Sequence, residues 1–339
     1  MDSQNLAITA ITPPTAVPGG EVSIQCRGFR PGLPCGSKVL FGEIEAAIVS
    51  ASAGRVVAIV PDSPAAQGVI LHVDGATSAC YPYLLGTRLA SNLHPVTNPV
   101  ISPDGDIITT ISGSRGQQSD HPLVRITRDG RVTPFPCKVM NPTGLAYGAE
   151  GQLYISSRAD GTILRYTDYE HLEVIAEDLG VPCGIVFDAD GRLFVGDRTG
   201  NVFRIDPDSS RQVIARLPPS VSAYHLATDS EGDLYVTGPT LAMRDPVYRI
   251  SRSGKITTIL EGLARPQGLA VGREGDLWIA AAYGGKKGVF RYSKRSKTIS
   301  HPVAGPMLVG LALEGPNIFL ADNSGIFRLT AGDAAGSIS

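Results

Sequence analysis

Residues 182–215 read PCGIVFDADGRLFVGDRTGNVFRIDPDSSRQVIA, and this stretch holds one complete copy of the repeat that decides the fold. It consists of four short apolar segments, PCGIVF, LFVGD, VFRID and RQVIA, which are separated by turn residues such as Asp190-Gly191. Acid-glycine pairs supply the positive φ angle that a tight hairpin needs. The stretch therefore predicts a four-stranded antiparallel sheet built from consecutive strands.

The same pattern recurs from residue 96 onward with a period of about 40 to 46 residues. Every copy has an acid-glycine turn after its first strand, at Asp104-Gly105, Glu150-Gly151, Asp190-Gly191, Glu231-Gly232, Glu274-Gly275 and Glu314-Gly315. Every copy also has one arginine in its third strand: Arg125, Arg165, Arg204, Arg249, Arg291 and Arg328. Because this arginine recurs in all copies, we expect it to pair between or beneath the sheets. Six copies of a four-stranded unit predict an all-β fold with a six-bladed β-propeller over residues 86–331.

The sixth copy lacks a fourth strand, because the tail at residues 332–339 is short and polar. The missing strand is found before the first copy, where residues 87–90 read TRLA. We therefore expect this N-terminal strand to complete the last blade, which closes the ring and removes exposed sheet edges.

Composition and charge argue against several classes of function. The 339 residues carry a formal net charge of −2, so no overall field attracts nucleic acid or an anionic membrane. The densest basic stretch, residues 286–297, divides between two faces of the predicted propeller. No apolar run is long enough for a transmembrane helix or a secretory signal, so we expect a cytoplasmic protein without nucleic-acid or membrane partners. Five cysteines without a CxxC pair do not indicate a disulfide framework.

The N-terminal part, residues 7–85, alternates apolar runs with turns about every ten residues, as a small antiparallel sandwich does. Its characteristic positions are Ile11, Pro13-Pro14, Pro18-Gly19, Val22, Ile24, Gly28-Phe29, Val39, Phe41-Gly42, Ile59-Val60-Pro61 and Val69 to Val73. In this order they resemble the IPT/TIG family of Ig-like domains. The resemblance implies an Ig-like domain over residues 1–85 that acts as a spacer or assembly module, through a protein partner or self-association.

The repeat across residues 87–330 resembles the propellers of the NHL and SMP-30/gluconolactonase families. This resemblance is specific for the architecture and leaves two functions open, because one fold hosts many activities. The first is a binding or interaction protein that recognises a small polar ligand or a peptide at the channel mouth. The alternative is a hydrolase or lyase that acts on a lactone or another sugar-derived small molecule.

Candidate site residues lie where the first strands begin and in the loops of the same face. The position after the repeat proline carries Thr97, Thr143, Cys183, Tyr224, Gln267 and Val309. The next position is glycine in four copies but Asn98 and His225 in the other two. A polar residue that breaks a repeat needs another justification, which points to function. The loops between second and third strands add His121, Arg158, Asp197, Tyr283 and Asp322 as ligand-binding candidates.

The SMP-30/gluconolactonase resemblance implies a divalent metal held by a glutamate, asparagines and an aspartate. The corresponding positions are Thr97 for the glutamate, Thr143 or Cys183 for the asparagine, and Gln267 or Tyr224 for the aspartate. The usual ligand positions are therefore not matched, and the cofactor stays open. Asp197, Asp322 and Asn98 remain as an alternative ligand set.

Histidine chemistry is the other enzymatic option. If the protein is an enzyme, His225 is the candidate general base. The side chains that would position the substrate are Tyr224, Asn98, Thr143 and Gln267. Other histidines of the same face are His94, His121 and His301.

Overall fold

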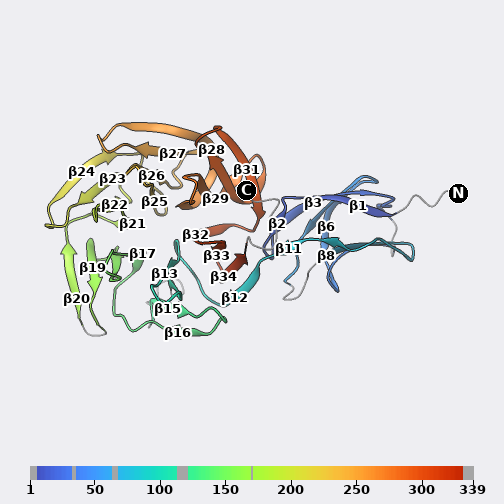
Figure 1. Ribbon diagram of the computed structural model, residues 1–339, viewed down its shortest axis with the longest axis horizontal. Helices are drawn as coiled ribbons and strands as arrows, with labels where there is room; N and C mark the ends of the chain where they lie inside the picture. Colours follow the sequence, from blue (N-terminus) through green and yellow to red (C-terminus); the bar gives the residue numbers. More distant parts are fainter. Residues whose placement is uncertain (1–5, 33–35, 63–67, 113–120, 169–170, 331–339) are drawn as a thin grey trace.

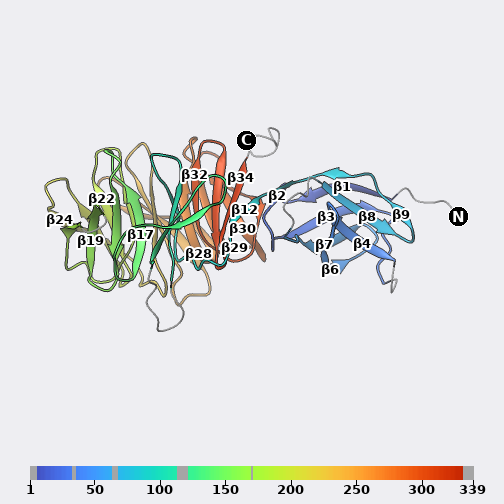
Figure 2. The ribbon, with the colours of Figure 1, turned by 90° about the horizontal axis from the view of Figure 1, so that it is seen from below.

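The computed structural model describes residues 6–32, 36–62, 68–112, 121–168 and 171–330, and these contain strands and turns but no helix. A ring of sheets forms the larger body, and a smaller N-terminal body lies against its rim (Figure 1). Seen edge-on, the ring is a thick disc from which the smaller body extends sideways (Figure 2). Among the described residues, no helix is long and apolar enough to cross a membrane. The predicted C-terminal tail, residues 332–339, lies outside the described residues.

The N-terminal body consists of two sheets that enclose one core. The first has the order β1 (Ala7–Thr12), β3 (Glu21–Arg27), β7 (Arg55–Ile59), β6 (Ala47–Ala51). The second has the order β10 (Tyr81–Pro82), β8 (Gly68–Val73), β4 (Ser37–Phe41), β5 (Ile44–Glu45), with β9 (Ala76–Thr77) on β8. Alternation places Val22 and Ile24 of β3 inward, where they share a core with Val39, Phe41 and Leu71 of the other sheet.

Four sheets of the ring have four antiparallel strands each. Their orders are β12 (Thr87–Ala90), β34 (Ile326–Thr330), β33 (Asn317–Asp322), β32 (Leu308–Glu314); β13 (Val100–Ile101), β14 (Ile107–Thr110), β15 (Leu123–Ile126), β16 (Val132–Pro134); β17 (Pro142–Tyr147), β18 (Leu153–Ser157), β19 (Thr162–Tyr166), β20 (Leu172–Ala176); and β21 (Pro182–Phe187), β22 (Leu193–Asp197), β23 (Asn201–Ile205), β24 (Arg211–Arg216). The six glycines of the acid-glycine turns have φ between 55° and 88°, which confirms why the repeat requires glycine there.

The rest of the ring is one nine-stranded sheet. Its order is β11 (Leu84–Leu85), β2 (Thr15–Ala16), β31 (Thr298–Ala304), β30 (Lys286–Ser293), β29 (Leu277–Tyr283), β28 (Ile256–Val271), β27 (Asp245–Ile250), β26 (Leu234–Thr237), β25 (His225–Thr228). The long strand β28 joins two repeats, because its first part, up to Leu263, pairs with β27 and its second part, from Ala264, pairs with β29. Hydrophobic clusters fill the spaces between successive sheets of the ring.

The ring is closed by the strand that the sequence predicted. Residues 87–90 form β12, which pairs antiparallel with β34 through Thr87 opposite Arg328 and Arg88 opposite Phe327. Pairing removes the open edge that the sixth repeat would otherwise leave.

A second junction was not predicted. Strands β2 and β11 come from the N-terminal segment, yet they extend the sheet of the ring by parallel pairing next to β31. The Thr15 hydroxyl donates to Pro302 O at 2.8 Å, and Val17 N donates to Ala304 O at 2.9 Å. A side chain at Gly20 would place its Cβ 2.7 Å from Ala304 O, so this close approach requires glycine. The predicted boundary at residue 85 therefore separates the repeats from the N-terminal segment in the sequence. In the structure the sheets on its two sides are not independent, because β2 and β11 belong to the sheet of the ring.

Five of the repeated arginines form ion pairs within their own sheet, whereas Arg328 donates to Arg128 O of the neighbouring sheet. Arg291 lies 2.7 Å from Asp276, and Arg249 pairs with Asp233; in both cases the aspartate directly precedes the second strand of the same repeat. Arg204 instead pairs with Asp206 at 3.0 Å. These ion pairs connect the third strand of a repeat to residues at the ends of the second or third strand, which agrees with a structural role for the arginine.

Candidate functional site

The first strands of the repeats surround a central channel. These inner strands are β13, β17, β21, β25, the second part of β28, and β32; each contacts the next, and β32 contacts β13. They enclose a cavity of about 410 Å³. The face with the loops between second and third strands is called the mouth face below, and the face with the acid-glycine turns is called the turn face.

The cavity occupies the half of the channel toward the turn face. Its lining runs from Thr97, Asn98, Gly144, Gly184 and His225 in the middle of the channel to Ile101, Tyr147, Phe187, Thr228, Val271 and Leu313 beside the turns. All six residues beside the turns are half-buried, so this end of the cavity meets solvent. On the mouth side, Thr143, Cys183, Tyr224 and Val309 are buried and do not line the cavity. The cavity thus opens at the turn face, whereas the sequence analysis expected a site at the mouth.

A layer of glycines separates the two halves of the channel. A Cβ on Gly144 would overlap Cys183 O, and one on Gly184 would overlap Tyr224 O. One on Gly310 would overlap Thr97 O. Neighbouring inner strands therefore approach too closely for side chains at these positions, which explains the glycine in four of the repeats.

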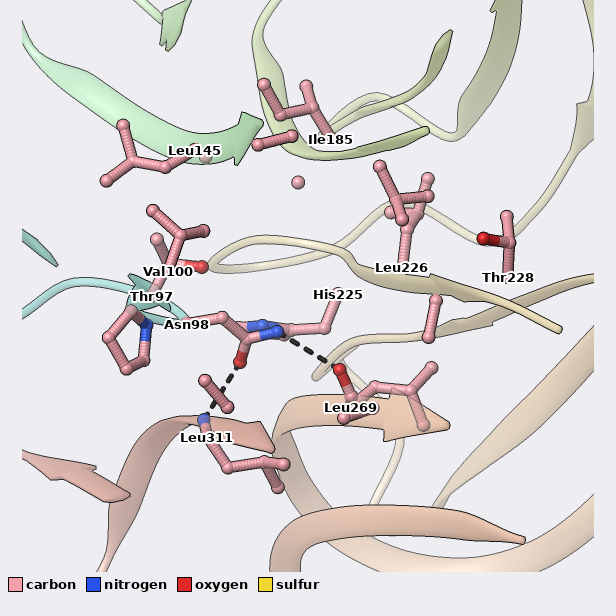
Figure 3. Close-up of a pocket in the computed structure, with 18 of the residues that line it drawn as sticks. Thr97, Asn98, Val100, Leu145, Ile185, His225, Leu226, Thr228, Leu269 and Leu311 are labelled. Atoms are coloured by element: carbon pink, nitrogen blue, oxygen red, sulfur yellow. Dashed lines mark hydrogen bonds between the residues drawn. The ribbon is translucent and has the colours of Figure 1, made fainter. Parts of the chain in front are cut away.

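Asn98 and His225 are the two residues of this layer that carry side chains, and both line the cavity (Figure 3). The Asn98 amide donates from Nδ2 to Leu269 O at 3.1 Å, and its Oδ1 accepts from Leu311 N at 3.1 Å. Asn98 therefore links its own strand to two other inner strands. This contact gives it a structural reason to break the repeat.

No comparable partner of His225 is found in the described part of the chain. Its side chain is 2% exposed, and Nδ1 is buried without a hydrogen bond. Burial lowers the pKa of His225 to about 4, so the imidazole is neutral near pH 7. The imidazole lines the cavity but Nδ1 is buried, so the ring would have to turn to offer this nitrogen to a molecule in the cavity. Since an unpaired buried polar atom costs free energy, this atom needs an explanation.

Two of the predicted loop carboxylates hold turns instead of facing the cavity. Asp197 accepts hydrogen bonds from Val181 N at 2.9 Å and Thr199 N at 3.1 Å. Asp322 accepts from the backbone and hydroxyl of Ser324, both at 2.8 Å. Their oxygens are engaged by the protein, which removes them from the candidate ligand set.

The other predicted residues are spread over the mouth side. The Thr143 hydroxyl is buried without a partner, and the Tyr224 hydroxyl donates to Pro218 O. Burial raises the pKa of the Cys183 thiol to about 11, although Arg158 and Arg198 oppose this shift. The remaining candidates are His121 and Arg158, which are exposed, and Gln267 and Tyr283, which are half-buried. The structure therefore brings together Thr97, Asn98 and His225 around the cavity, and not the full predicted set.

The residues that the sequence analysis missed are the apolar wall of the cavity. Val100, Leu145, Ile185, Leu226 and Leu269 line it, one from each of five inner strands (Figure 3). They directly follow the glycine layer or lie one residue beyond it, so the repeat alignment contained their positions. Because they are apolar, they were predicted to be core residues of the strands and not residues of a binding site.

The described residues do not fit the divalent metal that the resemblance implies. No aspartate or glutamate is among the residues that line the cavity in the described part of the chain. Asp229, Glu231 and Asp233 do bring their oxygens within 4.8 Å of one another on the turn face. However, Lys294 contacts Asp229 at 2.7 Å and Arg249 pairs with Asp233, so protein cations already neutralise this group.

Comparisons with known proteins support the two parts separately. Residues 6–84 match the family model of the IPT/TIG domain. No curated protein sequence matches the chain. The resemblance to NHL repeats has no family-model support and stays a prediction.

Three solved structures share the fold. A gluconolactonase from Xanthomonas campestris aligns with a TM-score of 0.59 at 17% identity, over 72% of this chain and 88% of its own. Virginiamycin B lyase from Staphylococcus aureus aligns with a TM-score of 0.52 at 19% identity, over 87% and 98%. An auxiliary nutrient binding protein from Bacteroides thetaiotaomicron aligns with a TM-score of 0.52 at 12% identity, over 96% and 97%. Identities this low show a shared propeller-like fold alone and do not decide whether an activity is shared.

Proposed function

We propose that the ring is a six-bladed β-propeller and that the N-terminal body is an Ig-like sandwich. The blade number is supported by the two pairings of β28, since counting its parts separately gives two four-stranded units besides the other four sheets. The sandwich is supported by the core that its two sheets share. Its role in this proposal is to orient the ring as a spacer or assembly module.

The propeller is proposed to bind a small neutral molecule in the central cavity. The observation that carries the proposal is a largely apolar cavity whose inner end is lined by His225, a residue whose buried Nδ1 has no hydrogen-bond partner among the described residues. A cavity of about 410 Å³ lies within the range of small-molecule sites. The ligand would present an apolar body to the wall and one hydrogen-bonding group to His225, so it is less polar than the sequence alone suggested.

The lactonase alternative has weaker support. Hard divalent cations prefer carboxylate ligands, and the cavity lining among the described residues offers none. A general base at His225 would also need a pKa nearer the working pH than about 4. The likeness to gluconolactonases therefore supports a shared fold, and the cavity gives little support for a shared activity.

The binding proposal can be tested with N-phenyl-1-naphthylamine, a neutral aromatic amine whose fluorescence rises in apolar surroundings. We expect saturable binding to the full chain. The variant His225→Leu removes the hydrogen-bonding nitrogen while keeping an apolar side chain, and it should weaken binding by about fivefold, the equivalent of about 1 kcal/mol. The matched control is Thr143→Val, which removes another unpaired buried polar atom outside the cavity and should leave the Kd unchanged.

Two results would overturn the proposal. One is an absence of saturable binding to the wild-type protein. The other is an equal Kd for the wild-type protein and His225→Leu, which would place the probe away from the cavity.

A further inference from the structure

Asn98 and His225 stand on opposite sides of the channel. Going round the ring from β13 to β25, the inner strands β17 and β21 lie between them on one side, and β28 and β32 lie between them on the other. Both residues occupy the layer in which the other four repeats have glycine. The two side chains that break the repeat therefore lie at one level on opposite sides of the channel.

The Asn98 side chain is fixed in this position. Its amide bonds Leu269 on β28 and Leu311 on β32 at 3.1 Å each, so it is tied to the two inner strands on one side of the channel. Such a side chain cannot leave the channel without giving up two hydrogen bonds to buried backbone. The Asn98 side chain is therefore a fixed part of the channel wall and does not open and close the channel.

The cavity extends little beyond this layer toward the mouth. Of the residues one step closer to the mouth, Thr97 lines it, whereas Thr143, Cys183 and Tyr224 are buried and do not. The residues at the opposite end, such as Tyr147, Thr228 and Leu313, are half-buried. The lining thus reaches the solvent-exposed turn face at one end and stops close to the layer of Asn98 and His225 at the other.

We infer that Asn98 and His225 form a crossbar that closes the channel, so that ligands reach the cavity through the turn face and stop at the crossbar. This inference rests on the proposed binding function for its ligand but not for its geometry. A closed end limits the length of a ligand, which selects compact molecules and excludes a peptide threaded through the ring. Asn98 is then a specificity-determining residue, because it sets the depth of the cavity, and His225 provides the polar contact at its end.

Access can be measured without any ligand, by the rate at which methyl methanethiosulfonate modifies a cysteine placed in the cavity wall by Val100→Cys. Peptide mass spectrometry would distinguish this site from the native cysteines. Blocking the turn-face end with Leu313→Trp, or with Thr228→Trp if the first variant fails to fold, should slow the reaction by at least about tenfold, because thiol exchange depends on access. The matched control, Gln267→Trp on the mouth side, should change the rate by less than about twofold.

The crossbar itself is tested by the double variant Asn98→Gly, His225→Gly, which restores the glycine of the other repeats. In this background the turn-face tryptophan should no longer protect Val100→Cys, since a second path opens toward the mouth. The inference is overturned if Gln267→Trp slows the reaction and the turn-face variants do not, or if the double variant leaves protection intact. Failure of N-phenyl-1-naphthylamine to bind would contradict the proposed function alone, because the thiol rates do not depend on that probe.

Discussion

The two ends of the channel use polar side chains in opposite ways. On the mouth side, Asp197 and Asp322 are fully engaged in turn contacts, and neither lines the cavity. In the half toward the turn face, the wall is mostly apolar, and His225, which lines its inner end, has a buried Nδ1 without a hydrogen-bond partner among the described residues. A polar loop residue is therefore weak support for a binding site, because turns need such residues themselves. A buried polar atom that the fold leaves without a partner is stronger support.

The largest expected effect concerns the charge state of the channel histidine. Burial lowers the pKa of His225 from 6.5 to about 4, so between these pH values the unfolded chain binds a proton that the folded chain does not. The contribution of His225 to the free energy of unfolding should therefore fall by up to about 3 kcal/mol as the pH is lowered from 6.5 to 4, and it should be constant above pH 6.5. Urea unfolding at several pH values, followed by the single tryptophan, Trp278, would measure this slope.

The control for this pH dependence is His225→Leu, which should flatten the slope without abolishing it. His301 keeps part of the slope, because burial lowers its pKa to about 4 as well. An unchanged slope in His225→Leu would show that the imidazole is solvated. The contrast between the engaged carboxylates of the mouth side and an unpaired buried nitrogen at His225 would then not hold.

The next effect tests whether the mouth is closed. Cys183 is buried and its pKa is raised from 9.0 to about 11, whereas Cys80 is exposed. At pH 7.5 the thiolate fraction alone should make alkylation of Cys183 by iodoacetamide about 100-fold slower than that of an unperturbed thiol. Mass spectrometry of the labelled peptides would compare the two sites in one sample. Similar rates at Cys183 and Cys80 would mean that solvent reaches the inner strands from the mouth.

The sequence predicted the repeats well because each one repeats the same local chemistry. Acid-glycine turns, a strand arginine and apolar alternation are short-range signals, and β12 was found because it completes that pattern. The pairing of β2 with β31 was missed, since it depends on contacts between residues almost 300 positions apart, such as Thr15 with Pro302. No local pattern distinguishes a two-residue strand from a turn.

The candidate site was predicted in part for the same reason. Asn98 and His225 were recognised because they depart from a repeat, and both line the cavity. Whether a side chain is satisfied depends on neighbours that only the fold supplies. The sequence therefore could not separate His225, which lacks a partner at Nδ1, from Asp197, which has several.

A smaller effect distinguishes turn construction from binding. The change Asp197→Ala leaves the amides of Val181 and Thr199 without their acceptor, so we expect a loss of about 2 kcal/mol in the free energy of unfolding. Asp160→Ala, in the exposed loop of the preceding repeat, removes one acceptor of the Ser157 hydroxyl, which can still donate to Met140 O, so it should cost less than about 1 kcal/mol. Both variants should bind N-phenyl-1-naphthylamine with the wild-type Kd while folded. A selective loss of binding in Asp197→Ala would return the mouth to the list of candidate sites.

The smallest effect compares two of the unpaired buried atoms, Nδ1 of His225 and the hydroxyl of Thr143. Removing an unsatisfied buried polar group should raise stability, so His225→Leu and Thr143→Val are each expected to increase the free energy of unfolding by about 1 kcal/mol near pH 7. Only His225→Leu should also weaken binding of the probe, because only His225 lines the cavity. A stabilised variant that binds less well is the expected result where an unfavourable buried atom is kept for function. If His225→Leu instead lowers stability, the imidazole is satisfied in solution, and its unpaired nitrogen no longer supports a ligand site.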